Sequence, residues 1–375
     1  MEQRIFSVIF GEKRNMKPKP FFRSTFLLPI VLCLLPILAQ GQKEWHNALD
    51  IGLSGQAWSE LEHPYDRLPA KAKDVVRAPV WRLGTNSAGL SVHFKTNSRK
   101  IWAKWTVRYD NSMWHMTECG IKGVDLYMDD SGIWRYAGSG SPGSGKANER
   151  EILKGLDGEM HHFHMNLPLY DGIDTLWIGV EEGSVLESSS ILNGKPIVIY
   201  GTSIQQGGCA SRPGMAASNI ISRQLNREVI NLGFSGNGRM EMELAELIAE
   251  IDASAYVFDC LPNLHNLDVI YPLHMEFIPY IRSEYPDTPI FLVETATTVK
   301  SAIIAKDLEQ LNRQNEELRK AFKALKSEGI KKLYLISGED LIGTDQEGTV
   351  DGVHYTDLGF KRYADKLVGQ IKRKL

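Results

Sequence analysis

The chain has 375 residues, of which 43% are hydrophobic and 24% are charged, and its formal net charge is −3. This balance is typical of globular proteins and excludes a mostly disordered or fibrous chain. The first 41 residues hold six basic and two acidic side chains, so residues 42–375 carry −7. A mildly acidic chain without basic runs is a poor candidate for binding nucleic acid or an anionic membrane.

Residues 1–41 have the pattern of a secretory signal peptide, which we exclude from the fold. Basic residues precede the apolar run 25–39, which is too short to span a membrane as a helix. Ala39-Gln40-Gly41 then supplies small residues at a cleavage site. The basic residues are Lys17, Lys19 and Arg23. We expect export to the periplasm or the extracellular space, without a membrane span after cleavage.

Two details of this segment stay open. Translation could start at Met1 or at Met16, because the residues before Met16 add nothing that a signal needs. A lipoprotein signal on Cys33 is the alternative to simple cleavage. Leu32 argues against it, because it is bulky where such a signal has a small residue.

Three cysteines follow the signal segment, namely Cys119, Cys209 and Cys260. An odd number in an exported protein leaves at least one free thiol or an intermolecular bond. A Cys209–Cys260 disulfide would form if the loops that carry these residues meet, which the sequence does not decide. No metal-type spacing links the cysteines, so we expect no metal and no cofactor.

Residues 42–190 are predicted to form an N-terminal accessory domain with a β-sandwich fold. Apolar side chains alternate with polar ones in several short segments that are separated by Gly, Asp and Ser. This period of two is typical of half-buried antiparallel strands. The clearest examples are Ile101, Ala103, Trp105 and Val107, followed by Leu176, Ile178 and Val180.

Residues 191–375 follow a different pattern, in which short apolar runs alternate with helix-length segments. The alternation predicts an α/β domain with a parallel sheet, helices on both faces and right-handed crossovers. Amphipathic segments at 239–251 and 360–371 are predicted helices. Pro213 and Thr356 suit helix starts. The apolar runs are 196–200, 228–232, 255–259, 289–293 and 332–336.

Four predicted strand ends in this second half carry residues that could do chemistry. Ser203 follows the first strand, where the catalytic groups of a parallel sheet gather. The glycine-rich turn 231–238 follows the second, and Asn263 follows the third. Asp351 stands three residues before His354, so its carboxylate can accept from Nδ1–H and leave Nε2 free as a base.

Together these residues resemble the four signature blocks of the SGNH (GDSL-type) hydrolases. The matching residues are Gly201-Thr202-Ser203, Gly236, Asn263 and Asp351-x-x-His354. The chain is similar in particular to a bacterial subgroup of SGNH esterases with an N-terminal accessory domain, whose Gly-x-Asp-Leu-Tyr motif stands at 123–127. Thr202 departs from the wider family, which has Asp there, but the subgroup shares this change. The resemblance implies a flavodoxin-like three-layer α/β/α hydrolase domain after the β-sandwich.

The resemblance and the residue chemistry imply the same roles. Ser203 is the expected nucleophile, His354 its base, and Asp351 the group that orients His354. The oxyanion hole would consist of the backbone N–H groups of Ser203 and Gly236 and the side chain of Asn263.

Two other groups of residues are weaker candidates for a site. His162 and His164 share one face of a strand, but no acidic or cysteine ligand is near them in sequence, so we expect surface strand residues and no metal site. Trp114 and His115 precede the Gly-x-Asp-Leu-Tyr motif. If the sandwich packs over the carboxyl edge of the sheet, they would help to wall the substrate pocket.

We therefore expect an exported serine esterase that hydrolyses short acyl esters, in particular acetyl esters on carbohydrate. Its partner would be a small-molecule or glycan ester, and the oligomeric state stays open. One alternative is a catalytically silent glycan-binding protein. Another is a lipase or thioesterase of the same fold, although no long apolar lid segment favours a lipase.

Overall fold

A computed structural model of the chain describes residues 42–190 and 194–375. The predicted signal peptide, Cys33 and both candidate start sites lie outside the described residues. Over the part of the chain that is described, no helix has the length and apolar character needed to cross a membrane. The described residues form one compact unit.

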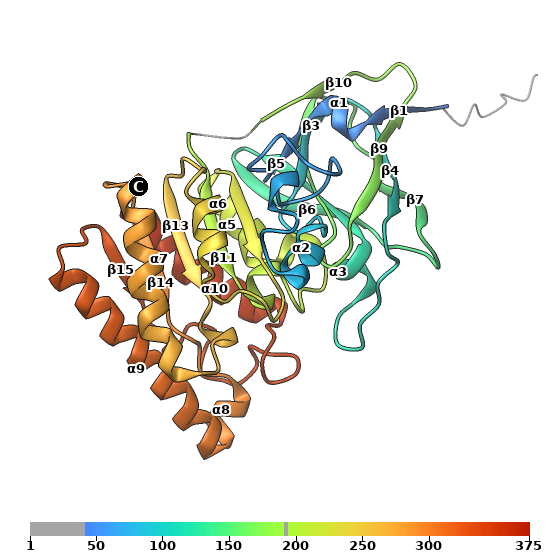
Figure 1. Cartoon of the computed structure of the whole chain (residues 1–375). Coiled ribbons are helices and arrows are strands. Elements are labelled where there is room, and N and C mark those ends of the chain that lie inside the picture. Colours follow the sequence, from blue (N-terminus) through green and yellow to red (C-terminus); the bar gives the residue numbers. More distant parts are fainter. Residues whose placement is uncertain (1–41, 191–193) are drawn as a thin grey trace, which may run out of the picture. The chain divides into compact units, whose positions relative to one another are not determined.

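The N-terminal part contains two antiparallel sheets that enclose a common core (Figure 1). One sheet has the order β1 (Lys43–Asn47), β9 (Ile173–Glu181), β4 (Lys100–Val107) and β7 (Ala147–Lys154). The other has the order β10 (Leu186–Ser188), β3 (Ser91–Thr96), β8 (His161–Asn166), β5 (Val124–Asp130) and β6 (Ile133–Gly140), with β2 (Leu53–Ser54) beside β3. The four alternating apolar residues of β4 are fully buried, as their period of two predicts.

The C-terminal part contains a parallel five-stranded sheet with the order β12-β11-β13-β14-β15. All five predicted apolar runs are strands, which confirms the α/β class. At the carboxyl edge Gly201 pairs with both Gly233 and Asp259, so three neighbouring strands end at the same level. The strands are β11 (Ile197–Gly201), β12 (Val229–Gly233), β13 (Ala255–Asp259), β14 (Ile290–Val293) and β15 (Leu333–Ile336).

Helices cover both faces of this sheet and give it the expected three layers (Figure 1). One face packs against α6 (Met242–Ile248), α7 (Ile270–Glu284) and α9 (Ala305–Ser327). The other packs against α5 (Ala217–Leu225) and α10 (Asp357–Ile371), whose N-cap is Thr356 as predicted. Shorter elements are α4 (Ser203–Gln206), η2 (Pro213–Met215), η3 (Leu261–Asn263), η4 (Leu267–Val269) and α8 (Val299–Ile303).

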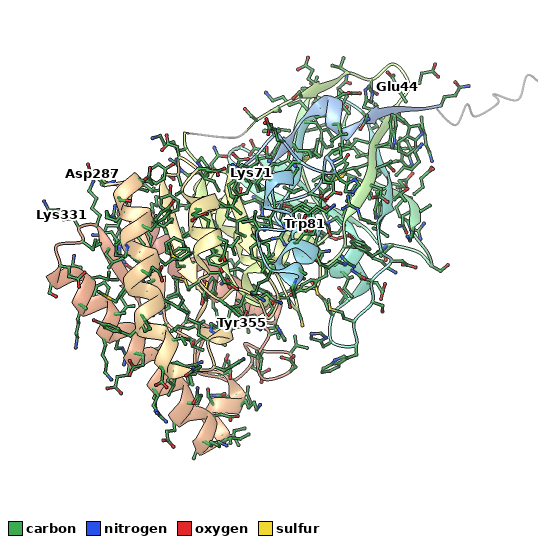
Figure 2. All side chains as sticks on the ribbon, in the orientation of Figure 1. Glu44, Lys71, Trp81, Asp287, Lys331 and Tyr355 are labelled. Carbon is green, nitrogen blue, oxygen red and sulfur yellow. The ribbon has the colours of Figure 1, made fainter. Side chains whose placement is uncertain are left out.

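A segment of the N-terminal part belongs to the core of the parallel sheet. Leu68, Ala72, Val76 and Val80 are buried together with side chains of β11 and β12. Trp81 of α2 (Ala78–Gly84) packs against the same cluster (Figure 2). The first half of the chain is therefore not sandwich alone, since this stretch adds to the hydrophobic core of the α/β layer. The remaining short helices are α1 (Ala48–Ile51), η1 (Ala70–Ala72) and α3 (Glu118–Lys122).

Candidate active site

Ser203 lies at the point where β11 turns into a short helix. The strand ends at Gly201, Thr202 is the N-cap, and Ser203 is the first residue of α4. The Thr202 hydroxyl accepts from the Ile204 N–H, while the Gln205 side chain accepts from the Thr202 N–H. This capping box fixes the turn. It leaves the Ser203 N–H without a carbonyl partner inside the helix and therefore free for a ligand.

Ser203, His354 and Asp351 form a continuous chain of hydrogen bonds. His354 Nε2 lies 3.0 Å from Ser203 Oγ, and His354 Nδ1 lies 2.7 Å from Asp351 Oδ2. Because an ionised carboxylate only accepts, Nδ1 carries the proton and Nε2 accepts from the serine hydroxyl. The structure thus brings Ser203 together with the Asp351–His354 pair, which lies about 150 residues further along the chain.

The Asp351 carboxylate is held in its charged form. Partial burial raises its pKa, but hydrogen bonds from the His354 side chain and from the backbone of His354 and Val353 outweigh this effect. The pKa of Asp351 therefore lies below its usual value. The backbone bonds are 2.8 Å and 3.0 Å long and end on Oδ1. Oδ2 is thereby left for the imidazole.

The predicted oxyanion-hole residues come from the neighbouring strand ends. Gly236 lies in an exposed turn after β12 with φ of 69°, and Asn263 ends η3 after β13. The Asn263 Oδ1 accepts from the Gly238 N–H at 3.2 Å. Because Oδ1 makes this bond, the Nδ2 amino group is the end left to donate. The turn after β12 is thus tied to the loop after β13.

Gly238 shows why this turn is rich in glycine. A Cβ atom at residue 238 would lie 2.1 Å from the carbonyl oxygen of Gly201, which no side chain tolerates. The absence of a side chain lets the turn pack against the backbone just before Ser203. The turn after β12 and the end of β11 are therefore in direct contact.

A buried carboxyl group is hydrogen-bonded to the short helix that begins at Ser203. Asp259, the last residue of β13, accepts from Gln205 Nε2 and from the Tyr363 hydroxyl, both at 2.7 Å. Gln205 in turn caps Thr202. Burial raises the pKa of Asp259 to about 7, against the lowering effect of the Tyr363 and Gln205 bonds. No sequence pattern predicted this network.

The loop 110–117 of the N-terminal part reaches the triad. The His115 ring centroid lies 5.3 Å from that of His354, and Trp114 packs on His115 at 4.8 Å. Trp114 is 86% exposed, so a broad aromatic face lies open to solvent beside the site. Trp114 and His115 therefore lie close enough to the triad to form a wall of the substrate pocket, as the hypothesis from the sequence requires.

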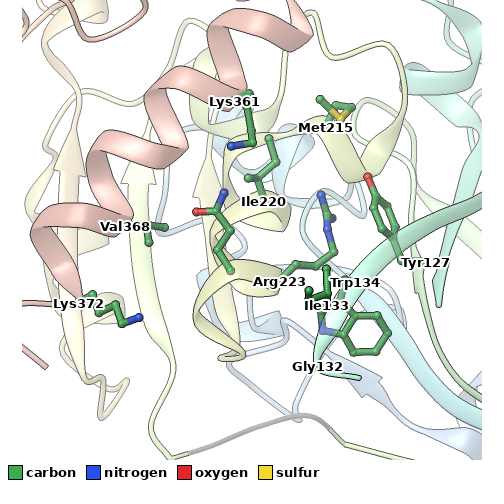
Figure 3. A pocket seen from close by; sticks show the side chains of 11 residues that line it. Tyr127, Gly132, Ile133, Trp134, Met215, Ile220, Arg223, Lys361, Val368 and Lys372 are labelled. Atoms are coloured by element: carbon green, nitrogen blue, oxygen red, sulfur yellow. The ribbon is translucent and has the colours of Figure 1, made fainter. Parts of the chain in front are cut away.

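Two cavities differ in their relation to the triad. One of about 240 Å³ is lined by Pro262, next to Asn263, and by Gly352 and Val353, next to His354. Another of about 680 Å³ lies between strands β5 and β6 and helices α5 and α10, with Arg223 and Trp134 in its wall (Figure 3). None of the triad residues lines the larger cavity. The smaller cavity is therefore the one adjacent to the triad.

Arg67 connects the N-terminal part to the strand before the oxyanion turn, and sequence reasoning missed it. Its guanidinium is buried and donates to the backbone oxygens of Asn231 (2.9 Å) and Gly233 (3.0 Å). It also donates to the carbonyls of Leu83 and Asn86. Burial lowers the pKa of Arg67 to about 9. Arg67 therefore joins the end of β12 to the backbone of the N-terminal segment 83–86.

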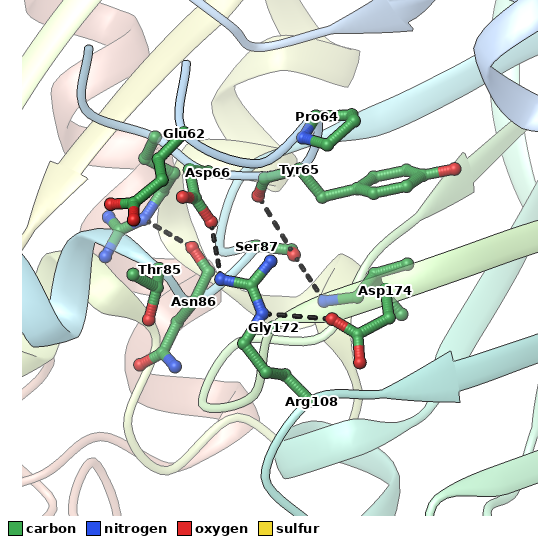
Figure 4. A network of polar contacts seen from close by, with 12 residues as sticks. Glu62, Pro64, Tyr65, Asp66, Thr85, Asn86, Ser87, Arg108, Gly172 and Asp174 are labelled. Atoms are coloured by element: carbon green, nitrogen blue, oxygen red, sulfur yellow. Dashed lines mark hydrogen bonds and ion pairs between the residues drawn. The ribbon is translucent and has the colours of Figure 1, made fainter. Parts of the chain in front are cut away.

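An ion-pair network holds the chain next to Arg67. Arg108 donates to Asp66 at 2.8 Å and to Asp174 at 3.0 Å (Figure 4). The Ser87 hydroxyl joins the Tyr65 carbonyl to the Ile173 N–H in the same region (Figure 4). The segment that carries Arg67 is therefore held in place by the bonds of its neighbours Tyr65 and Asp66.

The Gly-x-Asp-Leu-Tyr motif contacts the loop that follows the Ser203 helix. Asp125 is fully buried and accepts from Arg212 at 2.7 Å and from the Gly214 N–H at 2.8 Å. The Tyr127 hydroxyl lies 2.6 Å from the same Arg212 nitrogen. A Cβ atom at residue 214 would lie 2.4 Å from the Tyr127 ring, so only glycine fits there. The motif thus serves as a docking contact, a role that the sequence did not reveal.

The three described cysteines are free thiols, so Cys209 and Cys260 are not bridged in this structure. Both are buried, and burial together with the charge of nearby Asp351 raises the pKa of Cys209 to about 12. The sulfur of Cys209 and one ring nitrogen each of His115 and His354 lie within 4.8 Å of one another. No sequence spacing indicated this group.

The expectation that His162 and His164 are surface residues is wrong for His164. Its side chain is buried and packs on His93 with a centroid distance of 4.1 Å. Burial lowers the pKa of His164 well below its usual value, so the ring is neutral. Alternation placed both histidines on one face but did not tell whether that face is covered.

Two family models together match nearly all of the described chain. Residues 194–372 match the GDSL-like lipase/acylhydrolase family, and residues 43–186 match the N-terminus of the SGNH-hydrolase-type esterases. No significant match was found among curated protein sequences.

Solved structures give the same assignment. A protein described as a GDSL-like lipase from Bacteroides ovatus is 37% identical, with a TM-score of 0.84 over 88% of this chain and 98% of that one. The salicylyl-acyltransferase SsfX3 of a tetracycline biosynthetic pathway shares the fold at 16% identity, with a TM-score of 0.70 over 88% and 96% of the two chains. A family two carbohydrate esterase from Clostridium thermocellum, solved with cellohexaose, shares it at 12% identity, with a TM-score of 0.54 over 76% and 91%.

The α/β/α fold and these matches define a carboxylic ester hydrolase. The chain belongs to the GDSL-like lipase/acylhydrolase (SGNH hydrolase) family, in the group that carries the Gly-x-Asp-Leu-Tyr N-terminal domain.

Proposed function

We propose that this protein is a serine esterase in which Ser203, His354 and Asp351 form the catalytic triad. The observation that carries the proposal is the hydrogen-bond chain from Ser203 Oγ through both nitrogens of His354 to Asp351. Its order is the one that a hydroxyl nucleophile, a base and an orienting carboxylate need.

In the first half-reaction, Ser203 Oγ attacks the ester carbonyl while His354 Nε2 takes its proton. Asp351 holds the imidazole by its Nδ1–H and stabilises the imidazolium that forms. His354 then gives the proton to the leaving alcohol, and an acyl-enzyme remains. Water activated by the same nitrogen attacks the acyl group, and its proton returns to Ser203 as the acid leaves.

The negative charge of each tetrahedral intermediate would be stabilised by the N–H groups of Ser203 and Gly236 and by Asn263 Nδ2. Their rigidity supports this role, because donors fixed before the reaction need no reorganisation during it. Three contacts provide it: the Thr202 capping box, the Gly238–Asn263 bond and the Arg67 bonds to β12.

We further propose that the substrate is a short acyl ester, in particular an acetyl ester, on a carbohydrate. Ser203 is only 7% exposed, and the 680 Å³ cavity does not reach it, which disfavours a long acyl chain. The exposed Trp114 face beside His115 suits an apolar sugar face. The carbohydrate esterase that shares the fold was solved with a cello-oligosaccharide.

The cellular setting remains part of the proposal. Cleavage of a signal peptide at residues 1–41 would export the enzyme, with a sandwich domain at 42–190 and a hydrolase domain at 191–375. Acetylated polysaccharides outside the cytoplasm would then be its substrates. The silent glycan-binding alternative has no support from the site, since no triad member is replaced.

Two assays test the proposal in sequence. Hydrolysis of p-nitrophenyl acetate, with labelling of Ser203 by a serine-reactive phosphonate, tests whether the triad is active. Mass spectrometry of acetylated oligosaccharides after incubation then tests the substrate class by loss of acetyl groups. Inert p-nitrophenyl acetate and an unlabelled Ser203 would contradict the esterase proposal. Hydrolysis of p-nitrophenyl acetate with no deacetylation of any glycan would contradict the substrate proposal alone.

A further inference from the structure

Three metal-binding side chains from separate segments meet beside Ser203. His115 comes from the sandwich loop, Cys209 from the loop after α4, and His354 from the loop before α10. Their ligand atoms all lie within 4.8 Å of one another. Within residues 42–190 and 194–375 this is the one group of histidine, cysteine and acidic side chains found that could hold a metal ion.

We propose that His115, Cys209 and His354 form an inhibitory binding site for a divalent transition metal, with Zn²⁺ the best match. Two imidazoles and one thiolate suit zinc, and hard ions such as Mg²⁺ and Ca²⁺ prefer oxygen ligands instead. Three protein ligands leave the fourth tetrahedral position for water. Small side-chain movements would bring the ligand atoms to bonding distance.

The surroundings of His354 already have the form of a metal-ligand environment. Asp351 accepts from its Nδ1–H, so Nε2, which lies 3.0 Å from Ser203 Oγ, is the nitrogen with a lone pair for a metal. A carboxylate that fixes the tautomer of a ligating histidine in this way is a regular feature of zinc centres. The Asp351–His354 pair that prepares a base for Ser203 therefore also prepares a ligand.

The other two ligands have no competing role in the described structure. His115 Nδ1 is buried and has no hydrogen-bond partner among the described residues. Cys209 is 6% exposed and takes no part in the proposed ester hydrolysis. The His115 ring faces His354 on one side and Trp114 on the other. Both side chains are thus available to a metal.

Metal binding and ester hydrolysis would exclude each other. Coordination uses the Nε2 lone pair of His354, which is the pair that takes the proton of Ser203. The Cys209 thiol releases its proton to solvent as the S–Zn bond forms. Zn²⁺ therefore acts as a reversible inhibitor that a chelator removes.

Binding can be tested with Co²⁺, whose bond to a thiolate gives a charge-transfer absorption band in the near ultraviolet. We expect the wild-type protein to show this band with Co²⁺ and to lose it when Zn²⁺ is added. Cys209→Ala and Cys209→Ser should not show it. Cys119→Ala, which changes a thiol outside the group, should keep it. This readout does not depend on esterase activity.

Inhibition can be tested with Zn²⁺ on p-nitrophenyl acetate, with each rate expressed relative to the same variant without metal. We expect the Zn²⁺ concentration for half-inhibition to rise at least about tenfold in Cys209→Ala, since even outer-shell changes at zinc sites typically cost 10–100-fold. The rise should be absent in Cys119→Ala, and a chelator should restore the wild-type rate. Any of three results would overturn the proposal. They are a cobalt band that persists in both Cys209 variants, the absence of the band in the wild type, and equal Zn²⁺ inhibition in all variants. If the wild type itself does not hydrolyse the ester, the esterase proposal fails. The cobalt band would still show whether the metal site exists.

Discussion

Asp125 of the sandwich and Arg212 of the loop after the Ser203 helix form an ion pair of 2.7 Å in which the carboxylate is fully buried. The same carboxylate accepts from the Gly214 N–H and from Asn166. The chain between Ser203 and Arg212 is therefore fixed at one end by the parallel sheet and at the other by the sandwich. This contact ties the N-terminal part to the loop that follows the Ser203 helix.

We predict that Asp125→Ala lowers both stability and turnover. Removing one member of a buried ion pair leaves the other charge unpaired and typically costs about 3–5 kcal/mol. Urea denaturation measures the loss, and kcat on p-nitrophenyl acetate should fall because the loop after α4 loosens. Asp130→Ala is the matched control, since its pair with Arg135 is exposed and is expected to contribute under about 1 kcal/mol. Equal stability of the two variants would contradict the docking role.

Asp259 should make stability depend on pH. Burial raises its folded pKa from 3.8 to about 7, so between these values the folded state holds a proton that the unfolded chain has lost. Stability from this group is present below about pH 4 and is lost as the pH rises to 7. Asp259→Asn abolishes the titration, and its amide oxygen can still accept from Gln205 and Tyr363.

We therefore expect the stability of Asp259→Asn relative to wild type to rise between pH 4.5 and pH 7.5. The gain over this range is about 3 kcal/mol, at about 1.36 kcal/mol for each pKa unit. Urea denaturation across this range measures it. Asp252→Asn, an exposed aspartate, should show no such trend. A stability difference that stays constant with pH would argue against a raised pKa at Asp259.

Asn263→Ala tests the oxyanion hole. Loss of one such donor typically raises the barrier by about 2.7–4 kcal/mol, so kcat should fall on the order of a hundredfold or more. KM should change little, because the donor acts on charge that develops in the transition state. Asn266→Ala, in the exposed turn that follows, is the control. A kcat within a few-fold of wild type would remove Asn263 from the hole.

Trp114→Ala tests the proposed sugar contact. An aromatic stacking contact is typically worth about 0.5–1.5 kcal/mol, so kcat/KM on an acetylated oligosaccharide should fall about two- to tenfold. The rate on p-nitrophenyl acetate should stay the same, since that substrate has no sugar to stack. Equal losses on both substrates would indicate that Trp114 acts through the triad and not through the glycan.

Local sequence patterns predicted the parts of this structure that have local causes. The five apolar runs, the cap at Thr356 and the positions of Ser203 and Asn263 just after their strands follow from periodicity and turn chemistry. The prediction that Asp351 and His354 stand at a strand end is wrong, because they lie in the long loop between Ile336, the last residue of β15, and α10. Strand ends in a parallel sheet gather at one edge, which is why residues far apart in sequence could be assigned to one site.

Contacts between distant segments had no such signal. Arg67 and Asp259 resemble any charged residue in the sequence, and Asp125 stands in a recognised motif whose role the sequence did not reveal. The roles of all three depend on acceptors or donors that tertiary packing brings to them. His164 was misplaced for the same reason, since alternation does not tell which face of a sheet is covered. Buried polar residues whose partners come from distant segments are therefore the part of the structure that the sequence did not predict.

The central claim is that Ser203 is the nucleophile, and Ser203→Ala tests it most directly. The variant removes only the hydroxyl that lies 3.0 Å from His354 Nε2. Ester hydrolysis should fall to background, phosphonate labelling should disappear, and the thermal melting temperature should stay within a few degrees of wild type. Hydrolysis of p-nitrophenyl acetate by folded Ser203→Ala at a rate close to wild type would contradict the account.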